Sequence, residues 1–251
     1  MEIISQVWRS DLALLELAGM TIEHRPTHVL VSNGLLLLRR APLRRDMPRL
    51  FDLIERSFPG APHVAVGVDD PQAVPADLSR FEDAGFVVTD AIALRVDAST
   101  VRPTLTGRFD VRPLASEEDW AARSQLLRSA HPSRPVPHDQ VAAERRLEAT
   151  GQATWWGGFD GLRLVGSAGI VVALPHLSRC QGVTVDLGAR GTGLASALVA
   201  ASVQHAWERG GASTAMVLAD RGHAAIGLYE EIGFRPFETQ VRAARTALST
   251  S

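Results

Sequence analysis

One segment, residues 183–199, joins an alternating apolar stretch to a glycine-rich turn and then to a strongly helix-forming stretch. Val183 and Val185 alternate with their neighbours as strand residues do, and the leucine- and alanine-rich sequence from Leu194 favours a helix. The turn between them, residues 187–193, contains three glycines. A strand, a glycine turn and a helix N-terminus leave several backbone N–H groups unpaired at the positive end of the helix dipole. Such a turn can receive a phosphate, because glycine lets the backbone approach closely, but it can also serve only helix–sheet packing.

The spacing of these glycines narrows the choice of phosphate-bearing ligand. It matches neither G-x-x-x-x-G-K-S/T nor G-x-G-x-x-G, so nucleoside triphosphate and dinucleotide binding fit poorly. The run Arg190-Gly-Thr-Gly-Leu-Ala195 instead resembles the Arg/Gln-x-x-Gly-x-Gly/Ala signature of the GCN5-related N-acetyltransferases. In that family the loop binds the pyrophosphate of acyl-coenzyme A. The resemblance implies that six residues bind the coenzyme here: Arg190, Gly191, Thr192, Gly193, Leu194 and Ala195.

A second segment, Ala225-Ile-Gly-Leu-Tyr-Glu-Glu-Ile-Gly-Phe234, is similar to another element of the same family, A-x-x-L-Y-x-x-x-G-F. Gly233 suits the left-handed position that closes a helix, and Phe234 begins a new strand. Between the two motifs the pattern predicts a helix over 194–209 and a strand over 214–218, which is the family's order. Two motifs in the correct order are much more specific than either alone.

The resemblance also implies roles in acyl transfer. Val183 and Val185 stand where the family's splayed strand exposes backbone groups to the pantetheine and the thioester carbonyl. Tyr229, the only tyrosine, stands where the family often has the general acid that protonates the coenzyme sulfur; the alternative is a core aromatic. A phenol pKa of about 10 lies close enough to a thiol pKa of about 8.5 for such donation. No general base is assigned, and the residues considered are His131, His138, Glu144, His176, Asp186 and His223.

The two motifs and their resemblance to this family therefore predict that the C-terminal half is a mixed α/β domain with the acyl-CoA N-acyltransferase fold. A strand over 109–114 precedes a helix from Glu117, a proline-rich loop over 131–138 and a second helix over 139–149. A hairpin around Asp160-Gly161 then leads to the glycine turn.

The first half resembles a divergent copy of the second. Phe81-Glu-Asp-Ala-Gly-Phe86 aligns with Tyr229-Glu-Glu-Ile-Gly-Phe234, so phenylalanine replaces the tyrosine. Residues 28–38 form a hairpin with an Asn33-Gly34 turn, which we compare with the hairpin around Asp160-Gly161. No Arg/Gln-x-x-Gly-x-Gly/Ala motif occurs in residues 1–100. We expect a tandem arrangement: an accessory domain over 1–105 that does not bind coenzyme A, and a catalytic domain over 106–251. The alternative is that the two segments share only a common helix-stop pattern.

Composition limits the class of protein. A chain of 251 residues can form two domains, and its net charge of −2 creates no general attraction for nucleic acid or anionic membranes. No apolar run approaches the ~20 residues of a membrane span. All 26 cationic residues are arginine, and the single cysteine, Cys180, excludes an internal disulfide and fits a reducing cytoplasm. We therefore expect a cytoplasmic protein without nucleic-acid or membrane partners.

The function implied by the resemblance is an acetyl-CoA-dependent N-acetyltransferase that acts on an amine of a small molecule or a peptide N-terminus. Acetyl-CoA is the expected co-substrate, with no metal. Leu187 and Gly222 depart from the proline and asparagine that the family often has. These departures motivate the alternative, a non-catalytic acyl-CoA-binding sensor or partner-binding module. Transfer of a longer acyl or aminoacyl group is a third option.

Overall fold

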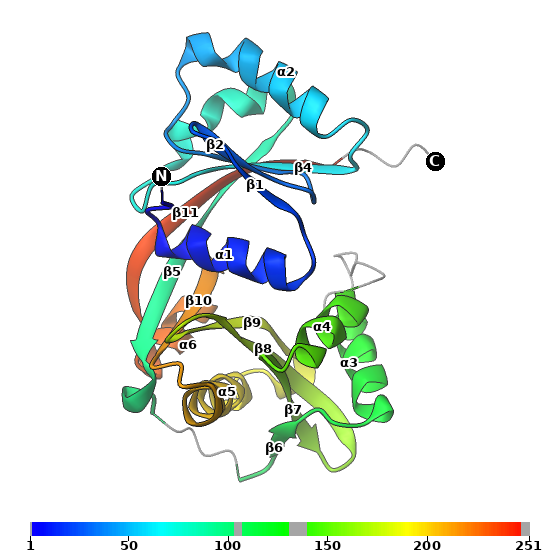
Figure 1. Cartoon of the computed structure of the whole chain (residues 1–251). Helices are drawn as coiled ribbons and strands as arrows, with labels where there is room; N and C mark the ends of the chain where they lie inside the picture. Colours follow the sequence, from blue (N-terminus) through cyan, green and yellow to red (C-terminus); the bar gives the residue numbers. More distant parts are fainter. Residues whose placement is uncertain (1, 103–106, 131–139, 247–251) are drawn as a thin grey trace. The chain divides into compact units, whose positions relative to one another are not determined.

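In a computed structural model, which describes residues 2–102, 107–130 and 140–246, the chain divides into two compact units (Figure 1). Unit 1 contains Met1–Ala93, Ala219–His223 and Pro236–Ser251, and unit 2 contains Leu94–Leu218 and Ala224–Arg235. Both units are mixed α/β, as expected. The predicted division at residues 105 and 106 differs from this one, because it assigns the last strand to the catalytic domain. No helix in the described part of the chain is long and apolar enough to cross a membrane.

Unit 1 is a mixed sheet with two long helices. Its helices and strands are α1 (Gln6–Leu17), β1 (Ile22–His24), β2 (His28–Val31), β3 (Leu35–Leu38), α2 (Met47–Ser57), β4 (His63–Val68), most of β5 (Val87–Asp97) and β11 (Arg235–Thr246). The strand order is β1-β2-β3-β4-β11-β5. β3 and β4 are parallel and are joined through α2, whereas β11 pairs antiparallel with β4. The last strand of the chain thus completes the sheet of the first half, which explains the shifted division.

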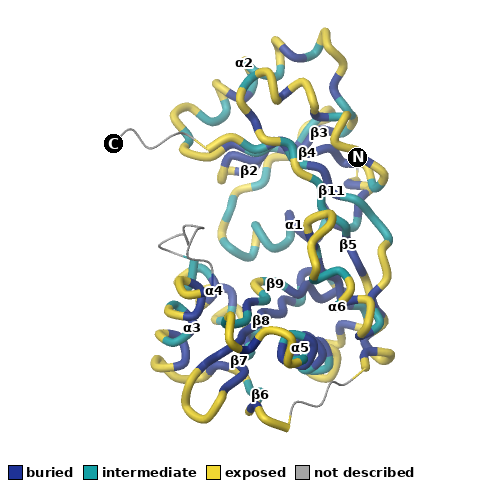
Figure 2. The backbone as a smooth tube through the Cα atoms, turned by 180° about the vertical axis from the view of Figure 1, so that it is seen from behind, coloured by how far each residue is buried: buried dark blue, intermediate teal, exposed yellow. Residues whose placement is uncertain are grey.

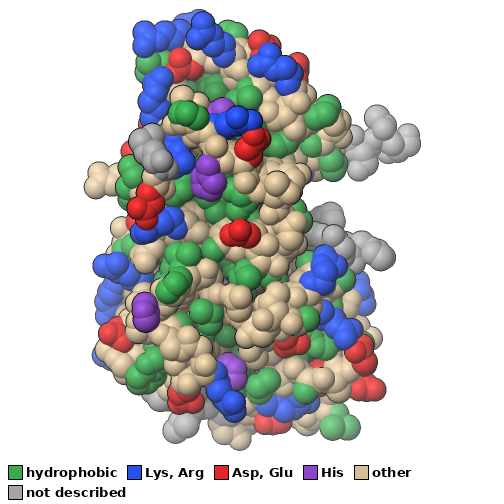
Figure 3. Space-filling view, viewed as in Figure 1, with side chains coloured by type: hydrophobic (Ala, Val, Ile, Leu, Met, Phe, Trp, Pro, Cys, Tyr) green, Lys and Arg blue, Asp and Glu red, His purple; other side chains and the backbone are tan. Residues whose placement is uncertain are grey.

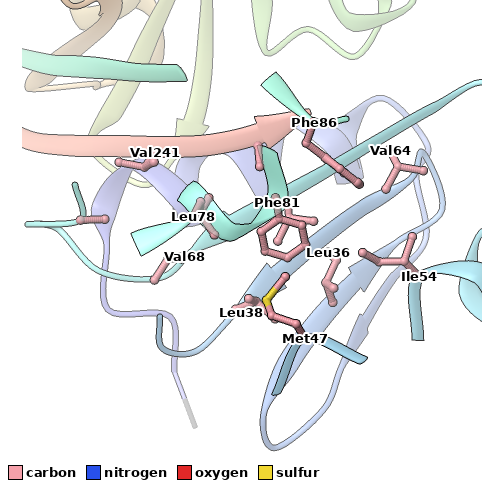
Figure 4. Packing of buried hydrophobic residues seen from close by; sticks show 13 residues of the cluster. Leu36, Leu38, Met47, Ile54, Val64, Val68, Leu78, Phe81, Phe86 and Val241 are labelled. Carbon is pink, nitrogen blue, oxygen red and sulfur yellow. The ribbon is translucent and has the colours of Figure 1, made fainter. Parts of the chain in front are cut away.

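Buried apolar residues between α2 and the sheet form the core of unit 1. Phe81 is fully buried there and contacts Phe86 edge-on with ring centroids 5.3 Å apart (Figure 4). On the opposite side Trp8 of α1 is also fully buried, and its indole donates to the carbonyl of Val68 at 2.7 Å. Gly67 permits this packing, because a β-carbon there would overlap the Trp8 ring.

Unit 2 contains the remaining elements. These are the end of β5, β6 (Asp110–Pro113), α3 (Glu117–Ala130), α4 (Gln140–Ala149), β7 (Ala153–Asp160), β8 (Arg163–Leu174), β9 (Leu177–Val185), α5 (Leu194–Gly210), most of β10 (Thr214–Asp220) and α6 (Ala225–Glu231). The strand order is β5-β10-β9-β8-β7-β6, with β9 and β10 parallel. The strands and helices predicted for the C-terminal half are therefore confirmed, with ends shifted by a few residues.

Two adjacent tryptophans show how helices cover both faces of this sheet. Trp155 is fully buried and its ring centroid lies 5.9 Å from that of Trp120 in α3. Trp156 instead contacts His205 of α5, with centroids 5.6 Å apart. Because successive strand residues point to opposite faces, α3 and α5 cover opposite sides of the sheet. The central strands β8 and β9 are largely buried between them (Figure 2).

The two halves of the sequence follow the same order of elements. Each has an antiparallel hairpin, a parallel β–α–β crossover, a short helix ending at Gly-Phe and a long strand. The helix stops match in detail: Phe86 N–H donates to Phe81 O at 3.2 Å, and Phe234 N–H donates to Tyr229 O at 3.0 Å. Such shared hydrogen-bond geometry supports the tandem arrangement.

One detail of the predicted alignment is wrong. The hairpin at Asn33-Gly34 joins β2 to β3, and β3 is the strand that leads into the parallel crossover. Its counterpart by position is the β8–β9 hairpin, which turns at His176, and not the β7–β8 hairpin at Asp160-Gly161. The turn sequences misled the comparison, since Asn-Gly and Asp-Gly both favour tight hairpins at any place in a fold.

Candidate functional site

The connection from β9 to α5 is exposed and rich in left-handed backbone. β9 ends at Val185, a single 3-10 turn covers Leu187–Ala189, and α5 begins at Leu194. Gly191 and Gly193 have φ values of +73° and +81°, and no side chain caps the helix at Gly193. The first N–H groups of α5 therefore lack side-chain partners at the positive end of a long helix.

Short hydrogen bonds fix the shape of this turn. Asp186 accepts from the backbone N–H of Gly188 at 3.0 Å and from the guanidinium of Arg163 at 2.8 Å. The Thr192 hydroxyl donates to the carbonyl of Ala189 at 2.6 Å. Because both carboxylate oxygens of Asp186 have partners, this residue anchors the turn and is poorly suited to act as a general base.

Other glycines, outside the turn, serve the packing of α5 against the sheet. A β-carbon at Gly158 would lie 2.5 Å from the side chain of Leu194, and one at Gly166 would lie 2.8 Å from it. Leu194 is almost fully buried at this contact, so only its backbone can face a ligand. A β-carbon at Gly191, in contrast, would meet nothing within 4 Å. The glycine in the turn is thus required by its backbone conformation and not by packing, which favours the anion-binding interpretation.

Arg190 lies in the middle of the turn over 187–193 and is exposed. Its Nε donates to the carbonyl of Val185 and its Nη2 donates to that of Ala130, both at 3.4 Å. These long bonds to neutral acceptors leave the positive charge without a carboxylate partner in the described part of the chain. Of the other predicted residues, Thr192 is exposed, and Ala195 is partly buried in the first turn of α5.

β9 and β10 pair over only part of their length. Leu177–Cys180 of β9 pairs in parallel with Thr214–Val217 of β10, and the two strands then continue without pairing to each other. β9 runs on to Val185 and is paired there only with β8. Val183 and Val185 lie in this part of β9, beyond its pairing with β10, and direct their side chains toward the cluster around α5. Within unit 2, β9 beyond Cys180 therefore lacks a strand partner on its β10 side among the described residues.

A one-residue bulge interrupts the same part of β9. Gln181 lies opposite Gly169 and Thr184 lies opposite Ser167, so two residues of β9 face one residue of β8. Gly182, inside the bulge, has a left-handed φ of +61°. Bulges of this kind re-aim a strand and are common next to active sites.

Tyr229 reaches this region from α6. Its side chain is only 5% exposed, and its ring centroid lies 5.9 Å from that of Phe234. Burial, reinforced by the neighbouring Cys180, raises the pKa of Tyr229 above its usual value. Cys180 is also the last residue of β9 that pairs with β10.

The remaining residues considered as bases do not converge on one site. Glu144 forms a bidentate ion pair with Arg123, and His176 occupies the β8–β9 turn with a φ of +65°. His223 belongs to unit 1. His131 and His138 lie outside the described residues. In the part of the chain that the structure describes, no group of histidine, cysteine and carboxylate residues is placed to hold a metal ion.

Two residues, Leu187 and Gly222, depart from the family pattern, and the structure explains the one at Gly222. Gly222 is exposed and has a φ of +80°. Asparagine and glycine are the residues that most readily adopt this left-handed conformation, so the backbone shape tolerates either. Leu187 is 60% exposed, and nothing in the structure explains a leucine there.

Comparison with known proteins agrees with this architecture. Residues 120–234 match the family model of the acetyltransferase (GNAT) family. A GCN5-related N-acetyltransferase from Kribbella flavida has 17% sequence identity and a TM-score of 0.69, with 96% of this chain and 97% of that chain covered. A GCN5-related N-acetyltransferase-like protein from Streptococcus suis has 13% identity and a TM-score of 0.58, with coverage of 96% and 100%. No curated protein sequence matches significantly.

A third solved structure has a duplicated architecture by its description. It is a tandem GNAT protein from the clavulanic acid biosynthesis pathway, with 11% identity, a TM-score of 0.59 and coverage of 97% of this chain and 89% of that chain. At these identities the likeness concerns the fold alone. The family model covers the splayed strand, the glycine turn and the Gly-Phe stop, and we conclude that residues 120–234 belong to the acetyltransferase (GNAT) family.

Proposed function

We propose that the chain is an acetyl-CoA-dependent N-acetyltransferase that acts on an amine of a small molecule or a peptide N-terminus. The catalytic domain is the second half, 106–251, and the first half, 1–105, is accessory. We place the activity in the cytoplasm, because one buried cysteine suits a reducing compartment. One observation carries the proposal: the uncapped glycine turn of α5 follows a strand edge that has just lost its partner.

The turn suits the negative charge of a pyrophosphate. Unpaired N–H groups at the start of α5 bind anionic oxygens, and Gly191 and Gly193 let them approach the backbone. Arg190 adds a cation beside the turn. Cationic and anionic side chains are otherwise interspersed over the visible face of the molecule (Figure 3). The anion would therefore be held locally rather than drawn by a general field.

Acetyl-CoA supplies an activated acetyl group in the form of a thioester. Backbone groups of β9 near Val183 and Val185 form hydrogen bonds with the pantetheine and with the thioester carbonyl. The N–H donors polarise that carbonyl, as the donors of an oxyanion hole do. Tyr229 donates a hydrogen bond to the departing sulfur. Its raised pKa keeps the phenol protonated, so it serves as a donor and never as a base. The acceptor amine must lose a proton first, since an alkyl amine is neutral in only about one part in 10³ at pH 7.

A second function, binding of an acyl-CoA without turnover, is favoured by one observation. Burial makes Tyr229 a weaker acid than a free phenol, which lowers its driving force for proton donation. A chain that senses acyl-CoA or docks a partner would need the turn and the strand edge but not the acid.

Calorimetric titration and thermal unfolding with acetyl-CoA test the first step. We expect a stoichiometry of one coenzyme per chain, and stabilisation of about 2.7 kcal/mol at a ligand concentration of 100 Kd. Arg190→Glu should weaken binding, because it places a negative charge at the turn. Arg209→Glu is the matched control, since Arg209 is exposed at the opposite end of the same helix.

Release of the coenzyme A thiol across a panel of amines and peptides tests turnover. Binding with turnover supports the enzyme, whereas binding without turnover across the panel supports the sensor. Absence of binding and of stabilisation would refute both functions. Equal weakening by the two charge reversals would show that the anion is not held at the glycine turn.

A further inference from the structure

We infer that Arg123 is a positioning residue of the acyl-transfer site, which holds the bulge of β9 in the shape that presents its backbone to the thioester. The inference rests on the proposed function and deepens it. Arg123 lies in the middle of α3, where its sequence context is that of an ordinary surface arginine. In the structure it is fully buried, and a buried guanidinium demands an explanation.

The guanidinium joins three elements of unit 2. Its Nε donates to Glu144 Oε2 at 2.6 Å and its Nη2 donates to Glu144 Oε1 at 2.7 Å, which ties α3 to α4. Its Nη1 donates to the hydroxyl of Ser167 on β8. Gln140 donates a further bond to Glu144 at 3.1 Å. Because this planar guanidinium is hydrogen-bonded on two sides, it has little freedom to rotate and its position is well defined.

The same guanidinium lies against the bulge. A β-carbon at Gly182 would be 2.9 Å from Arg123 Nη2 and 3.8 Å from Glu144 Oε1. A β-carbon at 182 would therefore press on the guanidinium, whereas its distance to Glu144 is an ordinary contact. On the other side of the bulge, the Thr184 hydroxyl donates to the carbonyl of Gly182 at 3.3 Å. Two observations favour glycine at 182: its φ of +61°, and the close approach of the guanidinium, which a β-carbon would displace.

This placement matters because of where the bulge lies. Cys180 is the last residue of β9 that pairs with β10, and Gly182 follows it by two residues. The backbone of the bulge is therefore the first part of β9 beyond its pairing with β10. Without β10 to hold it, that backbone depends on β8 and on the Arg123–Glu144 pair for its orientation. Hydrogen-bond donors for a developing oxyanion act only when they are preorganised, so rigidity here has a chemical use.

Stability alone is a weak reason to keep such a pair. Replacing both members of a buried ion pair by apolar residues of similar volume is often neutral or stabilising, whereas removing one member leaves an uncompensated charge. The double replacement Arg123→Met with Glu144→Met therefore separates the two roles. This double variant should preserve the fold, but it removes the guanidinium that holds the bulge of β9 in place.

The experiment measures the thioester carbonyl of bound acetyl-CoA by isotope-edited infrared spectroscopy. In the parent protein we expect the carbonyl band to move to lower frequency on binding. In the double variant it should return toward the frequency of free acetyl-CoA, with the Kd for coenzyme A changed by less than about threefold. Turnover should fall by about 10- to 100-fold, as a misplacement of the reacting groups would cause.

The matched control is Arg145→Met with Glu117→Met. This ion pair also joins α3 to α4, at 2.8 Å, but it is exposed and does not touch the bulge. The control should keep the parent carbonyl frequency and turnover. A double variant of Arg123 and Glu144 that binds coenzyme A and retains the parent carbonyl band would overturn the inference. Failure of the parent protein to bind acetyl-CoA would instead refute the proposed function, and the inference with it.

Discussion

Replacement of Tyr229 by phenylalanine is the sharpest test of the chemistry, because it removes one oxygen atom and little else. The ring is buried and contacts Phe234, and this contact survives in the variant. The first half of the chain already shows that phenylalanine fits such a helix stop, since Phe81 packs against Phe86 in the same way. We therefore expect the variant to fold with nearly unchanged stability.

The expected loss of rate follows from the strength of the lost hydrogen bond. Full proton transfer from a phenol of pKa about 10 to a thiolate of pKa about 8.5 is uphill by roughly 2 kcal/mol. Burial raises the pKa of Tyr229 further, so a hydrogen bond to the departing sulfur is the dominant contribution. A bond to a charged group contributes about 1.5–3 kcal/mol, which corresponds to about 10- to 150-fold in kcat. The raised pKa also predicts no alkaline decline in kcat from this residue below a pH of about 10.

The assay follows the released coenzyme A thiol with the best amine of the panel, under saturating acetyl-CoA. Calorimetry supplies the Kd for coenzyme A, and thermal unfolding verifies the fold. We expect kcat to fall while the Kd stays within about twofold, the signature of an interaction made in the transition state. A variant with the parent kcat would remove Tyr229 from the catalytic residues. An equal loss in kcat and in coenzyme affinity would assign it to binding.

Three further predictions concern stability and packing. The hydrogen bonds from Arg112 hold the pKa of Asp119 at about 2, below its usual 3.8; this stabilisation is present above pH 4 and is lost as the pH falls toward 2. Because Arg112 is partly exposed, we expect Asp119→Asn to remove only about 1 kcal/mol of this pH-dependent stability, measured by urea unfolding. Gly166→Val should overpack against Leu194, cost about 1–3 kcal/mol and weaken coenzyme binding by displacing α5; unchanged calorimetry would contradict this. Glu238→Gln should destabilise α1 by about 1 kcal/mol, seen as faster amide exchange, because the carboxylate accepts from two N–H groups of its first turn at 2.9 and 3.1 Å.

The parts of the fold that the sequence predicts well are those with local causes. The turn at Gly191 and Gly193 follows from glycine, the residue that adopts positive φ most readily. The stop at Gly233-Phe234 follows from helix-capping chemistry confined to a few residues. Both motifs can be recognised because each sets a backbone conformation, and backbone conformation depends on short runs of sequence.

The parts that the sequence does not predict depend on distant contacts. The order of residues does not indicate that β11 pairs with β4 of unit 1, since any long apolar strand could pair with several others. Arg123 was missed for the same reason. An arginine in a helix is normally exposed, whereas Arg123 is fully buried and bonded to Glu144 and to the side chain of Ser167 on β8. A glycine inside a strand, Gly182, was the one available signal, because such a residue often marks a bulge or a close approach.

The first half indicates which features of this fold are needed for packing and which for chemistry. The link that corresponds to the glycine turn, residues 39–46 between β3 and α2, contains no glycine. Its 3-10 turn at Arg44–Asp46 runs directly into α2, so the N–H of Met47 already donates to the carbonyl of Arg44. The helix start that would receive a phosphate is thus partly used by its own chain. The Gly-Phe stop, in contrast, is kept with the same hydrogen bonds, although its tyrosine is replaced by Phe81. The Gly-Phe stop therefore serves packing in both halves. The glycine turn and the phenol of Tyr229 are not needed for that packing, because the first half has neither. We propose that only the second half combines them into a site for acyl transfer.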